Sequence, residues 1–149
     1  MNGKTKKYIR VREVMTPSPR IIDGLATVRQ AVELMSKHHV SSLVIDRRHD
    51  GDEYGMVTVH DVAEKVIGQD RSQDRMNVYE ILSKPVLTVD VDMDIKYAIR
   101  ILTRFHLSRA LVTEKGSLVG IVTLRDMAIR YPVRSRRAAE EDQSDSDET

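Results

Sequence analysis

Apolar residues recur along the chain in two kinds of pattern. Four of them follow the spacing i, i+3, i+4 and i+7 and so form one stripe of a helix, Val28, Ala31, Val32 and Met35. Two short apolar runs follow, at residues 42–46 and 54–59, and runs of this length are typical of buried strands. The pattern therefore predicts a helix and then two strands in this part of the chain.

The same pattern occurs a second time. Residues 11–16 match residues 78–83, which lie 67 positions later, and the stripe returns with the same offset as Ile95, Ala98, Ile99 and Leu102. Gly-Met-Val-Thr-Val-His-Asp at 55–61 matches Gly-Ile-Val-Thr-Leu-Arg-Asp at 120–126, with an offset of 65. A repeat of this length indicates a repeated structural unit. We place the repeats at 11–68 and 78–131, joined by a polar linker at 69–77.

Short polar residues predict where the helices begin. Thr27 and Gln30 have the spacing of a capping box, and Asp94 is a suitable N-cap for the second stripe. We expect Asp61 and Asp126 to be the N-caps of a final helix in each repeat.

The remaining segments predict strands and a turn. Extended segments at 19–22 and 85–89 contain prolines, which disfavour the interior of a helix. Residues 110–113 and 118–124 form the second strand pair, joined by residues 114–116 as a three-residue hairpin. Each repeat then has the order β-α-β-β-α.

One such repeat is too small to cover its own sheet. We therefore expect an α/β (α+β) fold in which two β-α-β-β-α repeats pack face to face with pseudo-two-fold symmetry and leave two related clefts. Residues 1–10 form a basic arm. Residues 132–149 form a charged tail with too little apolar content for a core, so we expect disorder there.

Composition narrows the class of protein. The chain has 149 residues with one Phe and no Trp, so its core must be aliphatic. It has no Cys, which excludes disulfides and thiolate metal sites. No apolar run has the roughly 18 residues of a membrane span, and a net charge of +1 gives no overall signature of nucleic-acid binding. We expect a cytoplasmic protein without membrane or nucleic-acid partners.

The doubled Gly-φ-Val-Thr-x-x-Asp (φ apolar), the order of elements and the Glu-Val-Met-Thr-Pro opening at 13–17 resemble the tandem cystathionine-β-synthase-type (CBS) pair, or Bateman module. The resemblance covers about residues 9–131. It implies a regulatory module that is not an enzyme and that binds AMP, ADP, ATP or a related ligand in the clefts, with no required cofactor. It also implies a homodimer, and because no output domain is attached we expect a separate, unknown protein partner.

The resemblance assigns the ligand site to the two motifs. It implies that Asp61 and Asp126 accept hydrogen bonds from ribose hydroxyls. Thr58 and Thr123 can donate a hydroxyl to a phosphate, and a helix N-terminus favours the same anion. The alternative is that all four are ordinary cap and strand residues.

Further candidates lie around the motifs. Arg109 begins a strand where the first repeat has Ser42, so we expect the Asp126 site to bind phosphorylated ligands better than the Asp61 site. The alternative is an exposed charge at a strand end. Arg125 and His60 are additional phosphate candidates. Ile22 and Val89 are candidates to flank an adenine, or are simply core residues.

Other functions are less well supported by the residues. We find no motif that joins a nucleophile to a base, and we expect no metal site, because His38 and His39 are adjacent and point apart on a helix. His39 and His106 match in the two repeats and suggest a structural role at the helix ends. One alternative is an interaction scaffold with empty clefts. Another is attachment to nucleic acid or a membrane surface through the arm, which lacks an aromatic stacking platform.

Overall fold

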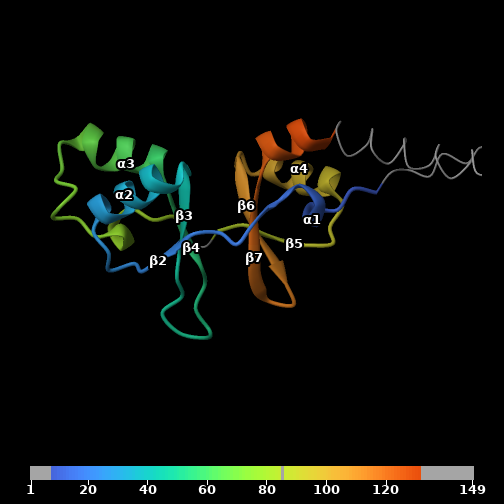
Figure 1. The fold of residues 1–149 in the computed structure, drawn as a ribbon, viewed down its shortest axis with the longest axis horizontal. Coiled ribbons are helices and arrows are strands. Elements are labelled where there is room, and N and C mark those ends of the chain that lie inside the picture. The colour runs from blue at the N-terminus through green and yellow to red at the C-terminus, as the bar shows by residue number, and fades with distance from the viewer. Residues whose placement is uncertain (1–7, 85, 132–149) are drawn as a thin grey trace, which may run out of the picture. The chain divides into compact units, whose positions relative to one another are not determined.

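The computed structural model describes residues 8–84 and 86–131. The first seven residues of the predicted basic arm and the predicted disordered tail at 132–149 lie outside the described residues. The chain divides into two compact units, which we describe separately. Unit 1 consists of Met1–Ser18 with Leu87–Thr149, and unit 2 is Pro19–Val86 (Figure 1).

Unit 2 contains a three-stranded sheet in the order β2-β3-β4. β2 and β3 are parallel, and β3 and β4 are antiparallel. Its elements are β2 (Ile21–Ile22), α2 (Val28–His38), β3 (Ser42–Ile45), β4 (Gly55–Thr58), α3 (Val59–Lys65) and the 3₁₀ turns η1 (Ile67–Gln69) and η2 (Val78–Glu80). The α2 stripe packs on the sheet in an aliphatic core that includes Val28, Ala31, Met35, Leu43, Val57 and Val62.

Unit 1 contains a four-stranded sheet in the order β1-β7-β6-β5. Its elements are α1 (Val11–Val14), β1 (Thr16–Pro17), β5 (Thr88–Asp90), α4 (Ile95–Arg104), β6 (Arg109–Glu114), β7 (Ser117–Thr123) and a helix that runs through residues 124–131. β5 and β6 are parallel, and β7 is antiparallel to both of its neighbours. The second stripe fills its core, with Ile95, Ala98 and Leu102 buried. The predicted mixed α/β class with two sheets is confirmed.

The predicted starts of the two long helices are confirmed. Thr27 accepts a hydrogen bond from the Gln30 amide at 3.1 Å, while the Gln30 side chain accepts one from the Thr27 amide at 2.9 Å. Asp94 accepts from the Lys96 amide at 3.0 Å. The two matching histidines follow these helices in the left-handed conformation, with φ values of 54° at His39 and 55° at His106. The matching conformation follows from their matching places in the two repeats.

Two local predictions are wrong. Asp61 is not the N-cap of α3: Thr58 is, because its hydroxyl oxygen accepts from the Asp61 amide at 3.1 Å and the helix begins at Val59. Thr123 accepts in the same way from the Asp126 amide at 2.9 Å. Each aspartate therefore sits inside the first turn of its helix, where its charge still favours the positive end of the helix dipole.

The second correction concerns the hairpin between β6 and β7. Glu114 is paired with Ser117, so it belongs to the strand. The turn is the two-residue Lys115–Gly116, with φ values of 50° and 81°. Positive φ at both positions matches the twist of the flanking strands, which favours this turn over the predicted three-residue loop.

The compact units differ from the sequence repeats at their openings. The opening of the first repeat belongs to unit 1, where Pro17 pairs with Gly120. The opening of the second repeat belongs to unit 2, where Ser83 forms a bridge with Met56. This pairing explains the glycine that begins each motif. A Cβ at Gly120 would lie 2.9 Å from the Thr16 carbonyl oxygen, and one at Gly55 would lie 3.3 Å from the Ser83 carbonyl oxygen.

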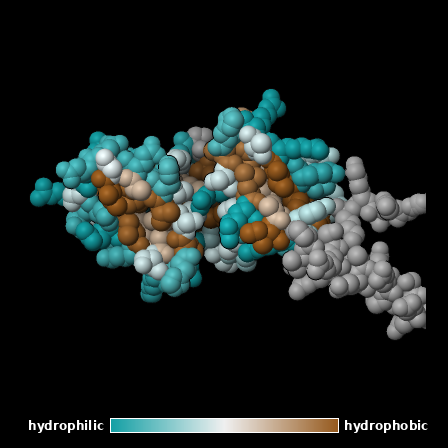
Figure 2. Space-filling model, turned by 90° about the horizontal axis from the view of Figure 1, so that it is seen from above, coloured by the Kyte–Doolittle hydropathy of each residue, from teal (hydrophilic) through white to brown (hydrophobic). Residues whose placement is uncertain are grey.

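The helical side of each unit exposes apolar side chains (Figure 2). The exposed apolar side chains of unit 2 include Val59 and Ile67, and those of unit 1 include Phe105 and Ile129. Apolar surface of this kind favours association with another protein surface. No helix in the part of the chain that the structure describes is long and apolar enough to span a membrane.

Candidate functional site

The motif of unit 1 lies where β7 ends and the helix at 124–131 begins. Thr123 is directly opposite Arg109 on the neighbouring strand β6, and residues opposite each other in an antiparallel pair project from the same face of the sheet. The structure therefore brings the predicted cation beside the predicted threonine. Ser42 has the equivalent place opposite Thr58 in unit 2, so the expected difference in charge between the two motifs is present.

The Asp126 carboxylate remains accessible in unit 1, with 26% of its side chain exposed. It lies 3.9 Å from the Arg130 guanidinium, one helical turn later. Arg130 also donates to the carbonyl oxygens of Val14 and Met15, at 2.8 and 3.1 Å. These contacts fix the arginine at the end of α1, and a long ion pair leaves Asp126 able to accept further hydrogen bonds.

The Asp61 carboxylate is more enclosed in unit 2, with 12% of its side chain exposed. It accepts from the Thr58 amide at 2.9 Å and from the Thr58 hydroxyl at 3.1 Å, and the Lys65 ammonium lies 3.3 Å away. The Thr58 hydroxyl thus donates its hydrogen bond to Asp61 and does not offer it to a ligand. In this arrangement the polar groups of the motif are satisfied by one another and by Lys65.

The remaining predicted residues lie in different surroundings. Arg125 and His60 are exposed, and His60 pairs with Glu64 at 2.7 Å. Ile22 is half-buried and packs against the core of unit 2. Val89 is 2% exposed in the core of unit 1, so within that unit it offers almost no surface to an adenine.

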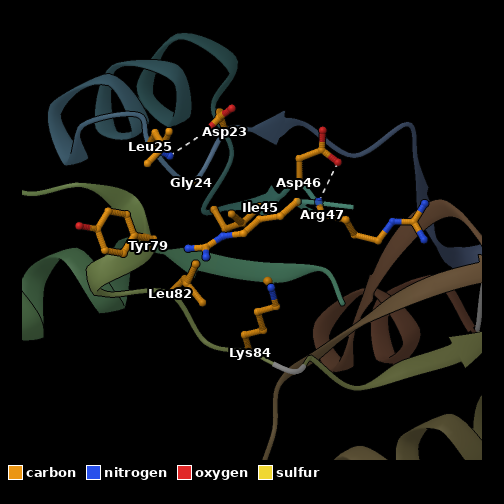
Figure 3. Close-up of a pocket in the computed structure, with 11 residues that line it drawn as sticks. Asp23, Gly24, Leu25, Ile45, Asp46, Arg47, Tyr79, Leu82 and Lys84 are labelled. Carbon is orange, nitrogen blue, oxygen red and sulfur yellow. Dashed lines mark hydrogen bonds between the residues drawn. The ribbon is translucent and has the colours of Figure 1, made fainter. Parts of the chain in front are cut away.

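A pocket of about 620 Å³ in unit 2 was not anticipated from the sequence (Figure 3). It contains none of the predicted site residues. The Lys84 ammonium on its border lies 2.7 Å from each oxygen of Asp52. This contact, together with the Arg48 amide, holds the pKa of the Asp52 carboxyl well below its usual range. Within residues 8–84 and 86–131, no group of three His, Asp or Glu side chains could hold a metal ion.

The family model of the CBS domain matches the chain twice, at residues 11–68 and 78–132. The chain belongs to the CBS domain family. This match confirms the resemblance that the doubled motif predicts.

Several proteins are similar to this CBS pair. The uncharacterised protein MK0525 of Methanopyrus kandleri is 32% identical over 120 residues, which are 78% of this chain. The CBS domain-containing protein YhcV of Bacillus subtilis is 26% identical, with 80% of this chain and 83% of YhcV covered. The hexameric CBS-CP12 protein from bloom-forming cyanobacteria is 30% identical with a TM-score of 0.78, and the match covers 90% of this chain and 83% of that one.

Several of the curated relatives are longer than this chain. The match spans 57% of the length of MK0525 and 46% of that of a 33.4 kDa protein of Thermofilum pendens. The chain therefore spans about half the length of these two proteins. The comparisons therefore establish that both repeats belong to the CBS domain family.

Proposed function

We propose that this CBS pair is a regulatory module that binds an adenosine-containing ligand at the Thr123–Asp126 turn of unit 1. The observation that carries the proposal is the Asp126 carboxylate, which is held in the first turn of a helix and is only weakly engaged by Arg130 at 3.9 Å. The CBS domain pair of MJ0100 was solved in complex with 5′-methylthioadenosine and S-adenosyl-L-methionine, so a fold of this kind can hold adenosine ligands.

The chemistry of the turn suits the two polar parts of such a ligand. A carboxylate accepts hydrogen bonds from the vicinal hydroxyls of a ribose, as it does in other nucleotide sites. The amides that begin the helix, the Thr123 hydroxyl and the Arg109 guanidinium favour a phosphate. Thr123 accepts from the Asp126 amide, which leaves its hydroxyl proton for another acceptor.

The motif of unit 2 is proposed to bind the same ligands more weakly. A ligand there must replace the bonds between Thr58 and Asp61 and the ion pair with Lys65. Exchanging one set of hydrogen bonds for another yields little net free energy. The enclosed Asp61 carboxylate weakens ligand binding in unit 2, and so does Ser42, which stands in place of Arg109.

Titration calorimetry with AMP, 2′-deoxy-AMP and 5′-methylthioadenosine tests the ribose contact. We expect AMP to bind and 2′-deoxy-AMP to bind about tenfold or more weakly, because a hydrogen bond to a charged group contributes about 1.5–3 kcal/mol. Asp126→Asn should weaken AMP by a similar factor. Asp61→Asn is the matched control and should leave the strongest site within about twofold.

Arg109→Gln separates the phosphate contact from the ribose contact. The variant should weaken AMP about tenfold, yet bind 5′-methylthioadenosine, which carries no phosphate, as the parent protein does. Absence of binding by AMP, ATP, 5′-methylthioadenosine and S-adenosyl-L-methionine at millimolar concentrations would refute the proposal. Equal losses in Asp61→Asn and Asp126→Asn would refute the preference for unit 1.

A regulatory role further requires that the ligand distinguish two states of the protein. We propose that these states differ in conformation or in assembly, as a homodimer or larger oligomer, and that a partner protein reads the difference. Light scattering with and without AMP tests the assembly. If no ligand binds and the protein still forms oligomers through its apolar helical faces, the scaffold interpretation replaces the regulatory one.

A further inference from the structure

The pocket of about 620 Å³ lies within unit 2. It opens at the carboxyl ends of the parallel strands β2 and β3, where Asp23 and Asp46 follow the strands, and at the beginning of β4. Thr58 is at the other end of β4, so the pocket and the Thr-x-x-Asp turn occupy opposite edges of this sheet. The volume is that of a small-molecule site, and the carboxyl edge of parallel strands is a common place for one.

In unit 1 the corresponding positions are occupied by charged side chains that pair with one another. Arg12 pairs with Asp92 at 3.4 Å and also with Glu114. The hydrogen bond to Glu114 is the main cause of the raised pKa of the Arg12 guanidinium. Arginine and two carboxylates thus satisfy one another without a ligand.

In unit 2 the same three positions, 67 residues away in the sequence, carry Tyr79, Leu25 and Arg47. All three line the pocket. The arginine and the two carboxylates of unit 1 are replaced by an aromatic ring, an apolar side chain and one cation. Arg47 thus stands where unit 1 has Glu114, and neither of the carboxylates that pair with Arg12 has an equivalent at these positions.

The apolar part of the pocket can hold a ring. Tyr79 is 45% exposed and Leu25 is 71% exposed, although both are large apolar side chains. In Figure 3 these two side chains lie on one side of the pocket, and Asp46 lies on the other. Ile45 and Leu82 add apolar surface between them. A planar ring that covers Tyr79 and Leu25 would remove this surface from water.

The charges around the pocket are unequally engaged. Lys84 is paired with Asp52, and the carboxylates of Asp23 and Asp46 accept from the amides of Leu25 and Arg47 at 2.7 and 2.8 Å. The Arg47 guanidinium lies 4.8 Å from the ring centre of Tyr54 and donates to the Asp50 carbonyl oxygen at 3.4 Å. Neither Arg47 nor Arg48 pairs with a carboxylate in the described part of the chain, so both remain available to an anion.

We propose that this pocket is a second ligand site, which binds a small molecule composed of a planar ring and an anionic group. The ring lies against Tyr79 and Leu25, and the anion, a phosphate or a carboxylate, meets the guanidinium groups of Arg47 and Arg48. The site is separate from the Thr123–Asp126 turn and does not depend on the ligand proposed there.

An NMR titration of the full chain with phenyl phosphate, benzoate and inorganic phosphate tests this proposal. We expect phenyl phosphate or benzoate to produce saturable shifts of the amides of Gly24, Leu25 and Tyr79, and the better probe identifies the anion. Inorganic phosphate should bind at least tenfold more weakly, because it lacks the ring. Arg47→Gln should weaken the better probe about fivefold or more, and Arg71→Gln, an exposed arginine elsewhere on unit 2, should not.

Gly24→Val fills the pocket with the residue that unit 1 has at the matching position, Val91. A Cβ at Gly24 would lie 3.4 Å from Ile45 and 3.6 Å from Tyr79, both of which line the pocket, so the valine should occupy pocket space and the variant should lose binding. Tyr79→Ala is a second variant that removes the ring without adding volume. Asp126→Asn should leave this titration unchanged, which distinguishes it from the test of the proposed function. Shifts that do not saturate, or that persist in both pocket variants, would overturn the proposal.

Discussion

Replacing Gly120 by alanine should destabilise unit 1 because the opening of the first repeat lies directly on this residue. A Cβ there would be 2.6 Å from the Met15 sulfur and 2.9 Å from the Thr16 carbonyl oxygen. Ordinary contacts begin at 3.4 Å. To relieve the contact with the Thr16 oxygen alone, strand β1 must move away from the new Cβ by about 0.5 Å. Crowding of this kind costs about 1–3 kcal/mol, and the stiffer unfolded chain returns about 0.4–1 kcal/mol. We expect a net loss of about 1–2 kcal/mol.

Urea unfolding measures this loss as a lower midpoint with an unchanged slope. Two glycines provide controls. Gly24→Ala meets only ordinary contacts and should be neutral or slightly stabilising. Gly116→Ala has no neighbour within 4 Å but a φ of 81°, so its cost of about 1–2 kcal/mol comes from backbone strain.

A double mutant identifies the cause of the Gly120 effect. Met15→Ala removes the sulfur contact, so the cost of Gly120→Ala should be smaller in that background by more than about 0.5 kcal/mol. The Thr16 oxygen is backbone and keeps part of the cost. The reasoning fails if Gly120→Ala is as stable as Gly24→Ala, or if the two losses are additive.

Two further predictions concern local features. His39→Val should cost about 1–2 kcal/mol, because a β-branched residue resists the φ of 54° found at this helix end; His39→Gly should not, and equal stability of the two variants in urea would contradict the assignment. Asp52→Asn removes the carboxylate charge whose pairing with Lys84 depresses the pKa of Asp52. The free energy of unfolding of the variant should therefore be lower than that of the parent protein by a constant amount above about pH 4, and the difference should shrink as the pH falls toward the depressed pKa. Urea midpoints between pH 7 and pH 2 measure this deficit, and one that does not change with pH would exclude the ion pair as its cause.

Much of the fold could be predicted because the signals are local. The stripe of Val28 and its partners, the capping box at Thr27 and the doubled glycine-to-aspartate motif each involve residues a few positions apart. The hydrogen bonds that these residues make close within one turn or one strand end. The errors in these predictions were also local. Thr58 and Thr123, not the aspartates three positions later, cap the final helices, and both threonine and aspartate are favourable N-cap residues.

The site could be predicted only in part. The motifs indicated two equivalent strand-to-helix turns, and the serine opposite Thr58 indicated the difference in charge between them. The unequal exposure of Asp61 and Asp126, at 12% and 26% of the side chain, was not foreseen, because the two motifs have the same residue types at these positions. The sequence left open whether Val89 is a core residue, and nothing in it predicted that Leu25 and Tyr79 would be exposed.

The sequence by itself determined that the chain contains two copies of one βαββα pattern and where the long helices and the main strands lie, because periodicity and short-range hydrogen bonds are properties of neighbouring residues. Only the tertiary structure decided that the opening of each repeat joins the other compact unit, that this opening crowds the two motif glycines, and that unit 2 has a pocket where unit 1 has a cluster of paired charges. These features depend on contacts between residues about 30 to 100 positions apart, such as Gly55 with Ser83 and Arg12 with Glu114. Packing selects such contacts from the whole chain, and no local pattern encodes them.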